Sequence, residues 1–161
     1  MSITADGNEN LRHCLDKYSD MVVRIAFQNL KCMEDAEDVA QEVFLKLITA
    51  RPAFASEEHE KAWLIRVTVN RCRDCLRSAW FRRHTNLRED IPHRDASPDV
   101  LDAVMRLPVN YRNVIYLHYY EDMTIAQIAS SLGQKENTIA SWLFRARSRL
   151  KKSLEGGFDD E

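Results

Sequence analysis

Basic side chains cluster in two stretches of the chain, and such clusters are the chemistry that binds polyanions. Residues 62–83 contain six basic residues against one acid, and residues 124–152 again contain six against one. The whole chain of 161 residues nevertheless has a formal net charge of −2. Two basic stretches on a near-neutral chain predict two separate contacts with a polyanion. The alternative is that each stretch is a solvated helix face.

The cysteines are the candidates for redox or metal chemistry. Cys72 and Cys75 form a C-x-x-C pair, as in redox motifs and in half of a zinc site. Both fall inside a predicted helix, however, and Cys14 and Cys32 form no second short-spaced pair. The histidines show no ligand spacing, and no Gly-rich phosphate loop or nucleophile motif is present. Buried thiols are therefore favoured over an enzyme, and no metal or cofactor is expected.

The spacing of apolar residues predicts the helices that position these groups. It indicates helices over about residues 10–30, 34–50 and 60–80, with a loop over residues 51–59. On the third helix a polar face lies opposite the apolar stripe, and it carries Trp63, Arg66, Asn70, Arg73 and Arg77. Such a face suits single-stranded DNA, because exposed bases stack on rings while cations follow the backbone. Trp63 taken alone is better explained as a core anchor.

The second half of the chain contains a helix-turn-helix pattern. Thr124 with Gln127 is a capping box, and Gly133 suits the turn before the next helix. The second helix of such a motif enters the major groove and reads base edges with its N-terminal residues. Here these are Lys135, Glu136, Asn137, Thr138 and Ser141, while Arg145, Arg147 and Arg149 would follow the phosphates. The alternative is an ordinary helical hairpin.

Together these patterns predict an all-α chain of two small helical domains. Strand patterns and internal repeats are absent, and there are only four glycines and four prolines. We expect a first domain over residues 1–80, a flexible linker over 81–96, a second domain over 97–154 and an acidic tail over 155–161. Ser97-Pro98-Asp99 would start the second domain, as a cap followed by proline. No signal peptide or membrane span is visible, which predicts a cytoplasmic protein.

Three blocks of the chain resemble the extracytoplasmic-function (ECF, group IV) sigma factors of the sigma-70 family of bacterial RNA polymerase. The first is DAEDVAQEVFLKLI, residues 35–48, and the second is AWLIRVTVNRCRDCLR, residues 62–77. The third covers residues 107–150 and contains the RAR signature, Arg145 to Arg147. Members of this family keep only the domains sigma-2 and sigma-4, so the resemblance implies a sigma-2-like first domain and a sigma-4-like second domain.

The resemblance also implies partners and site residues. The first block would dock on the β′ coiled coil of core RNA polymerase, through Asp35, Asp38, Gln41, Glu42, Phe44 and Leu45. The β flap of the polymerase would be a further contact. The minus-ten promoter element would be melted and read by Arg51, Phe54, Trp63, Arg66, Asn70, Arg73 and Arg77, with an extruded base held by the loop of residues 51–59. Sigma-4 would bind the minus-thirty-five element. Members are often held inactive by an anti-sigma factor, and none of these roles requires an enzyme.

Departures from the family pattern limit what can be carried over. Ala140 and Trp142 stand where basic residues are common, so the promoter sequence is not predicted. Lys135 stands where a Ser cap is usual, which leaves the recognition helix without a clear side-chain cap. The rival interpretation is a stand-alone helix-turn-helix regulator of duplex DNA. That class needs no acidic docking block and would normally show half-site symmetry through dimerisation.

Overall fold

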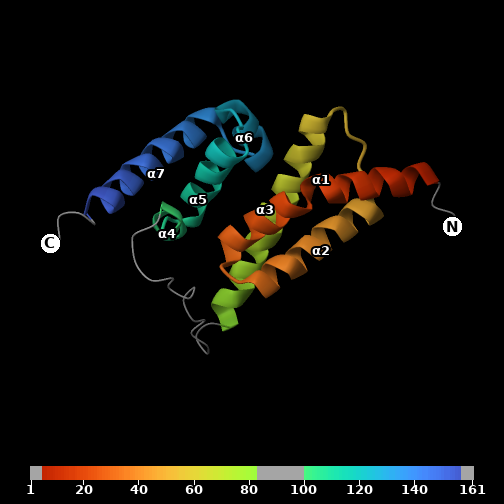
Figure 1. Ribbon diagram of the computed structural model, residues 1–161, viewed down its shortest axis with the longest axis horizontal. Coiled ribbons are helices and arrows are strands. Elements are labelled where there is room, and N and C mark those ends of the chain that lie inside the picture. Colours follow the sequence, from red (N-terminus) through yellow and green to blue (C-terminus); the bar gives the residue numbers. More distant parts are fainter. Residues whose placement is uncertain (1–4, 83–99, 157–161) are drawn as a thin grey trace. The chain divides into compact units, whose positions relative to one another are not determined.

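The structure is a computed structural model that describes residues 5–82 and 100–156. Every regular element within those ranges is a helix (Figure 1), which confirms the predicted all-α fold. The chain divides into two compact units, Met1–Arg77 and Ser78–Glu161. Most of the predicted linker, and the predicted helix start at Ser97, lie outside the described residues. None of the helices in the described part is long and apolar enough to cross a membrane.

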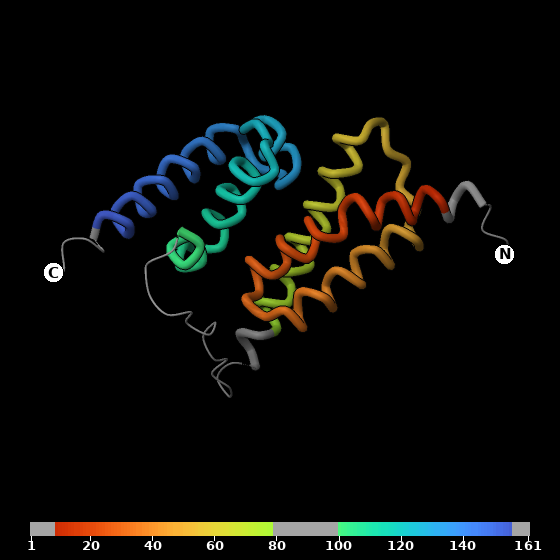
Figure 2. The backbone as a smooth tube through the Cα atoms, in the orientation of Figure 1, coloured from red at the N-terminus to blue at the C-terminus, as the bar shows by residue number. Residues whose placement is uncertain are grey.

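The first unit contains α1 (Ala5–Leu30), α2 (Met33–Ala50) and the part of α3 (Glu57–Arg82) that ends at Arg77. The chain reverses between α1 and α2 at Lys31, whose φ of 58° is left-handed, so the two helices lie antiparallel and side by side (Figure 2). Lys17 of α1 pairs with Glu57 of α3 at 3.2 Å. The core is built from apolar faces of all three helices, and its most buried members are Val22, Ile25, Ala26, Ala36, Val39, Val43, Leu64, Ile65 and Cys72.

The third helix begins earlier than its apolar periodicity predicts. It starts at Glu57, so His59, expected in the loop, lies in the first turn. The backbone N–H of His59 donates to Ser56 Oγ at 3.1 Å, which satisfies one of the free donors of that turn. The turn also carries three acids, which the positive end of the helix dipole favours. Polar start signals, rather than apolar spacing, therefore set this boundary.

The second unit contains α4 (Val100–Met105), α5 (Val109–Ile115), the π-helical turn η1 (Tyr116–Tyr120), α6 (Ile125–Leu132) and α7 (Glu136–Gly156). Because η1 follows α5 without a break, the two form one rod, here called the α5–η1 rod. The long helix α7 packs against α4, α5 and α6 (Figure 1). The core of the second unit includes Val114, Leu117, Ile128, Ile139, Leu143 and Ala146.

The predicted capping box and glycine turn are present between the rod and α7. The Gln127 backbone N–H donates to Thr124 Oγ1 at 3.1 Å, and the Thr124 N–H donates to Gln127 Oε1 at 2.9 Å. Gly133 has a φ of 66°, a left-handed conformation that glycine adopts without the strain a Cβ would cause. Helices α6 and α7 are thereby joined as a helix-turn-helix.

Candidate polymerase and nucleic-acid interfaces

One face of α2 combines acidic and apolar exposed side chains. Asp38, Gln41 and Glu42 are exposed, Asp35 is half-buried, and Leu45 is 59% exposed. These residues recur every three or four positions, so they share one side of the helix, while Val39 and Val43 face the core. We call Asp35, Asp38, Gln41, Glu42 and Leu45 the acidic face. Its carboxylates can pair with basic groups, and Leu45 adds an apolar contact.

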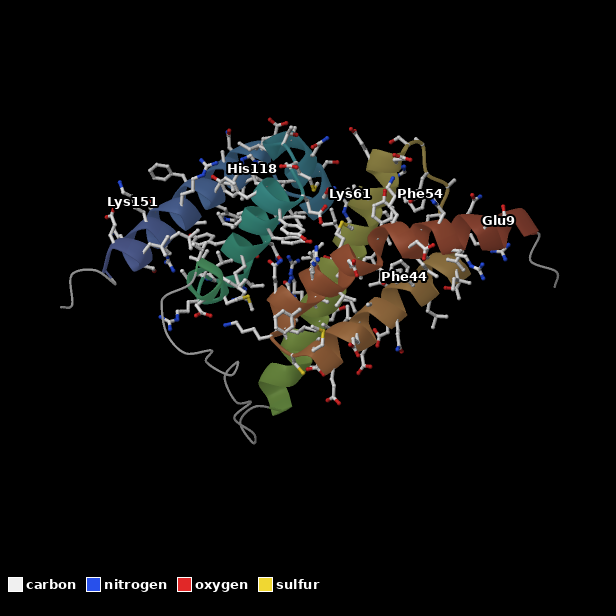
Figure 3. The ribbon with its side chains drawn as sticks, in the orientation of Figure 1. Glu9, Phe44, Phe54, Lys61, His118 and Lys151 are labelled. Carbon is white, nitrogen blue, oxygen red and sulfur yellow. The ribbon has the colours of Figure 1, made fainter. Side chains whose placement is uncertain are left out.

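Phe44 does not belong to this face, although the resemblance placed it there. It is only 7% exposed and packs in the core of the first unit (Figure 3). The apolar spacing already indicated this position, since Phe44 follows Ala36 and Ala40 at helical intervals. Its side chain packs on the buried side of α2 and is therefore not available to a partner at the surface.

The acidic face is tied to α3 by an ion pair that sequence reasoning missed. Arg71 Nε donates to Glu42 Oε2, and Arg71 Nη2 donates to Glu42 Oε1 at 3.3 Å. This hydrogen bonding raises the pKa of Arg71 above its ordinary value. The two residues are 29 positions apart, so no local pattern could reveal the pair. The Glu42 carboxylate therefore already has a partner within the unit.

Three aromatic rings lie close together where the loop after α2 joins the first turns of α3. The Phe54 ring lies edge-on to the rings of His59 and Trp63, with centroids 5.5 Å and 5.8 Å away. The backbone N–H of Ala55 donates to His59 Nδ1 at 3.1 Å, which fixes the loop to the first turn of α3. Phe54 and Trp63 are both half-buried, so each keeps part of its ring open to solvent. Trp63 thus supports the loop without being a full core anchor.

The polar face of α3 extends from this aromatic group. Arg66, Asn70, Arg73 and Arg77 are all exposed, whereas Leu64, Ile65 and Cys72 are completely buried. Arg51, also exposed, ends α2 in a left-handed conformation with a φ of 44°. Rings, an amide and guanidinium groups on one side of the unit are suited to stacking bases and to binding phosphates.

The C-x-x-C pair is not arranged as a reactive site. Cys72 is completely buried and Cys75 is half-buried within α3. Burial raises the pKa of the Cys72 thiol to about 12, and it also raises the pKa of Cys14, to about 11. Thiols with raised pKa values are poor nucleophiles at neutral pH. No group of three potential metal ligands occurs among the described residues.

The predicted reading residues lie at and just before the N-terminal end of α7. Lys135, Glu136 and Asn137 are exposed, while Thr138 and Ser141 are half-buried. Ile139, Leu143 and Ala146 anchor the opposite side of the helix in the core. The Ile139 N–H donates to the carbonyl oxygen of Lys135 at 3.1 Å, so the helix begins directly after that residue. Phe144, which the sequence did not single out, is 70% exposed beside Arg145.

The arginines expected to follow the phosphates are exposed, and two of them contact tyrosines. Arg147 Nε donates to the Tyr119 hydroxyl, and the Arg149 guanidinium carbon lies 5.3 Å from the Tyr111 ring centre. Another arginine has a structural position that the sequence did not reveal. Arg112 is 6% exposed and donates to the carbonyl oxygens of Leu107, at 2.7 Å, and Met105, at 3.3 Å.

Comparisons with known proteins match both units. The family described as sigma-70 region 2 matches residues 14–82, and the family described as sigma-70, region 4 matches residues 98–150. An ECF RNA polymerase sigma factor of Mycobacterium tuberculosis, SigL, is 31% identical over 164 residues, covering 90% of this chain and 89% of the relative. SigM of the same organism is 32% identical over 137 residues, covering 81% of this chain and 70% of the relative.

Solved structures share the fold. The sigma factor RpoE of Bartonella quintana, solved in complex with the anti-sigma factor NepR, matches with a TM-score of 0.77 and 21% identity, covering 95% of this chain and 99% of that one. CnrH, solved in complex with the cytosolic domain of CnrY, matches with a TM-score of 0.68 and 21% identity, covering 92% of this chain and 90% of that one. Taken with the matches to both units, the sequence relatives decide the family: the chain belongs to the ECF sigma factors of the sigma-70 family.

Proposed function

We propose that this chain binds core RNA polymerase and directs promoter-specific transcription initiation. The observation that carries the proposal is the division of charge within the first unit. Acids such as Asp38 are exposed on α2, whereas Arg66, Arg73 and other polar residues are exposed on α3. A DNA-binding protein gains nothing from an acidic face that repels its ligand, unless that face binds a second, basic partner. A stand-alone regulator would not need it.

The acidic face is the proposed docking surface for the polymerase. Asp35, Asp38 and Gln41 would contact basic and polar groups of the β′ coiled coil, and Leu45 would bury its exposed side chain against it. Glu42 contributes less, because its carboxylate is already paired with Arg71. The family likeness extends the partners to the β flap and to promoter DNA.

The loop after α2 and the polar face of α3 are the proposed site for the melted minus-ten element. A base leaving the duplex loses its stacking at a cost of a few kcal/mol. Phe54 and Trp63 would replace part of that stacking, while phosphates of the same strand would bind the arginines at 51, 66, 73 and 77. Asn70, exposed on the same face, would contact bases or sugars.

The N-terminal end of α7 is the proposed reader of the minus-thirty-five element. Lys135, Glu136 and Asn137, together with Thr138 and Ser141, would face base edges in the major groove. Phe144 adds an exposed apolar group, which suits contact with a thymine methyl group. Arg145, Arg147 and Arg149 would bind phosphates.

The remaining expectations follow from this role. Transcription initiation places the chain with the polymerase in the cytoplasm, and no catalytic step is assigned to it, because the polymerase carries the chemistry. The structurally similar sigma factor RpoE was solved in complex with the anti-sigma factor NepR. We therefore include an anti-sigma factor among the partners of this chain. The domain division is proposed as a first domain over residues 1–80, a linker over 81–96, a second domain over 97–154 and an acidic tail over 155–161. Helix α3 extends two residues into this linker, to Arg82, and α7 extends two residues into the tail, to Gly156.

Size-exclusion chromatography with core RNA polymerase tests the docking face. The native chain should co-elute with core enzyme, and Asp38→Arg should abolish co-elution by placing a cation against a basic surface. Asp20→Arg on α1 is the matched control, since it makes the same charge change at an exposed acid on another helix. It should co-elute like the native chain.

Two other outcomes would contradict the proposal. If Asp20→Arg and Asp38→Arg weaken co-elution equally, net charge rather than the acidic face controls binding. If the native chain retards duplex DNA but never binds core enzyme, the stand-alone regulator becomes the better interpretation.

A further inference from the structure

Two arginines of α7 are each held against a tyrosine of the α5–η1 rod. The Arg147 Nε–H donates to the hydroxyl of Tyr119, and its guanidinium carbon lies 5.4 Å from the ring centre. The guanidinium carbon of Arg149 lies 5.3 Å from the ring centre of Tyr111. Both arginines are exposed, and an exposed arginine without such contacts would sample many rotamers.

The two arginines leave α7 on opposite flanks. Each residue turns an α-helix by about 100°, so positions two apart differ by about 200° around the axis. The buried residues Ile139, Leu143 and Ala146 form the face of α7 that packs in the core of the second unit. The α5–η1 rod packs against α7, and its two tyrosines contact arginines on either side of this buried face.

The distance of Arg147 and Arg149 from the N-terminal end of α7 favours contact with the DNA backbone over contact with bases. Arg147 and Arg149 are 11 and 13 residues after Glu136, which at 1.5 Å per residue is roughly 17 Å and 20 Å. The major groove is about 8.5 Å deep and about 12 Å wide. When the N-terminal end of α7 reaches base edges at the floor of the groove, these two residues lie farther from the bases than the groove is deep, so the phosphates of the strands that border each flank are the groups they can contact.

The hydrogen bond to Tyr119 uses only the Nε–H of the Arg147 guanidinium. A guanidinium has five N–H donors, and Nε supplies only one of them. The two terminal nitrogens remain able to bind a phosphate in the bidentate geometry that arginine favours. Tyr119 lies in the π-helical turn η1, which is closed by a hydrogen bond from the Glu121 N–H to the Tyr116 carbonyl oxygen at 3.2 Å. Such turns recur at functional sites.

We propose that Tyr119 and Tyr111 are positioning residues that hold Arg147 and Arg149 as a pair of phosphate-binding groups, one for each strand bordering the major groove. This inference rests on the proposed DNA-binding function of the second unit and adds the residues that prepare its arginines. A guanidinium that is ordered before DNA arrives loses less conformational freedom on binding. The arginine charge itself is unchanged by the tyrosine, and this separates positioning from charge in an experiment.

The test measures affinity and its salt dependence for the full chain. The probe is a short duplex that the native chain, alone or bound to core polymerase, enriches from a random-sequence pool. Tyr119→Phe should weaken binding roughly three- to tenfold by loss of preorganisation, with an unchanged slope of log affinity against log salt. Arg147→Gln should lower that slope by about 0.9, the value for one lost phosphate contact. In the Arg147→Gln background, Tyr119→Phe should have no further effect.

The second pair is tested in the same way, and a matched control separates positioning from general loss of a hydroxyl. Tyr111→Ala should weaken binding at an unchanged slope, and it should have no effect once Arg149 is replaced by Gln. Tyr120→Phe is the control, because Tyr120 is exposed in the same turn and its stacking on Tyr116, at 5.0 Å, does not need the hydroxyl. It should bind like the native chain.

Three results would overturn the inference, and they differ in what else they overturn. If Tyr119→Phe binds as tightly as Tyr120→Phe, Tyr119 is not a positioning residue, while the proposed function stands. If Arg147→Gln lowers stability but changes neither affinity nor slope, the pair is structural. If the native chain enriches and binds no duplex, even with core polymerase, the helix-turn-helix part of the proposed function fails as well.

Discussion

Arg71 on α3 is the internal partner of Glu42 on α2, and their ion pair joins the proposed polymerase face to the helix proposed to bind DNA. Both oxygens of the carboxylate accept hydrogen bonds from the guanidinium. The side chains are 41% and 49% exposed, so solvent screens much of their attraction. The pair therefore fixes the geometry between α2 and α3 more than it adds stability.

Glu42→Gln should weaken polymerase binding less than Asp38→Asn, because the Glu42 carboxylate is shared with Arg71. The free energy of unfolding of the Glu42→Gln variant should be lower than that of the native chain by less than about 1 kcal/mol, the range for exposed ion pairs. Competition binding to core enzyme and urea unfolding measure the two effects. A larger loss of binding for Glu42→Gln than for Asp38→Asn would show that Glu42 is a main contact.

Arg112→Met should destabilise the second unit by about 3 kcal/mol. Arg112 is buried and donates to the carbonyl oxygens of Met105 and Leu107, and hydrogen bonds from charged groups contribute about 1.5–3 kcal/mol each. Urea unfolding with hydrogen exchange of α7 amides would localise the loss. Arg106→Met is the control, because Arg106 is exposed and its replacement should change stability little. Equal losses for the two variants would contradict a clamping role for Arg112.

Thr124→Ala should lower the stability of the second unit by about 1 kcal/mol, since it removes the side-chain oxygen that caps α6. Thr124→Ser keeps the oxygen and should retain most of the stability. Chemical unfolding of the two variants beside the native chain distinguishes the cap from a general effect of shortening the side chain. Identical stabilities for Ala and Ser would exclude the cap as the cause.

The stability of the first unit should fall at alkaline pH. Burial raises the pKa of Cys72 to about 12 and that of Cys14 to about 11, from ordinary values of 9.0. Above pH 9.0 the unfolded chain loses thiol protons that the folded chain retains, so unfolding becomes more favourable as pH rises toward the folded pKa values. The contribution of the two buried thiols to the free energy of unfolding is fully present below pH 9.0, their ordinary pKa.

Urea unfolding in reductant, at one pH below and one above 9.0, measures this effect. Cys72→Ala should show a smaller decrease in stability than the native chain. An unchanged dependence in Cys72→Ala would mean that other groups cause the decrease.

Phe54→Ala should impair promoter melting more than polymerase binding. Stacking of one base on an aromatic ring contributes roughly 1–3 kcal/mol, so the melted fraction should fall about tenfold. Permanganate reactivity of unpaired thymines in the complex with core enzyme measures melting, and co-elution measures docking. Phe54→Tyr keeps the ring and should retain melting, whereas a loss of melting in both variants would point to a disturbed loop instead.

Features that depend on neighbours in the sequence could be predicted without the structure. The capping box joins Thr124 and Gln127, three residues apart, and the turn at Gly133 follows from the one residue type that tolerates its left-handed backbone without strain. The buried stripe of α3 and its exposed arginines follow from helical spacing, because 3.6 residues per turn is a property of the backbone alone. The order of the three blocks already indicated the family.

Only the tertiary structure decided which of those side chains are available. Glu42 is paired with Arg71, and Arg147 is held by Tyr119, in contacts that join residues 29 and 28 positions apart. Such contacts depend on how helices pack, and side chains far apart in the chain meet only when the core brings their helices together. Local spacing therefore determined the faces of each helix, and packing determined which of their residues remain free to bind a partner.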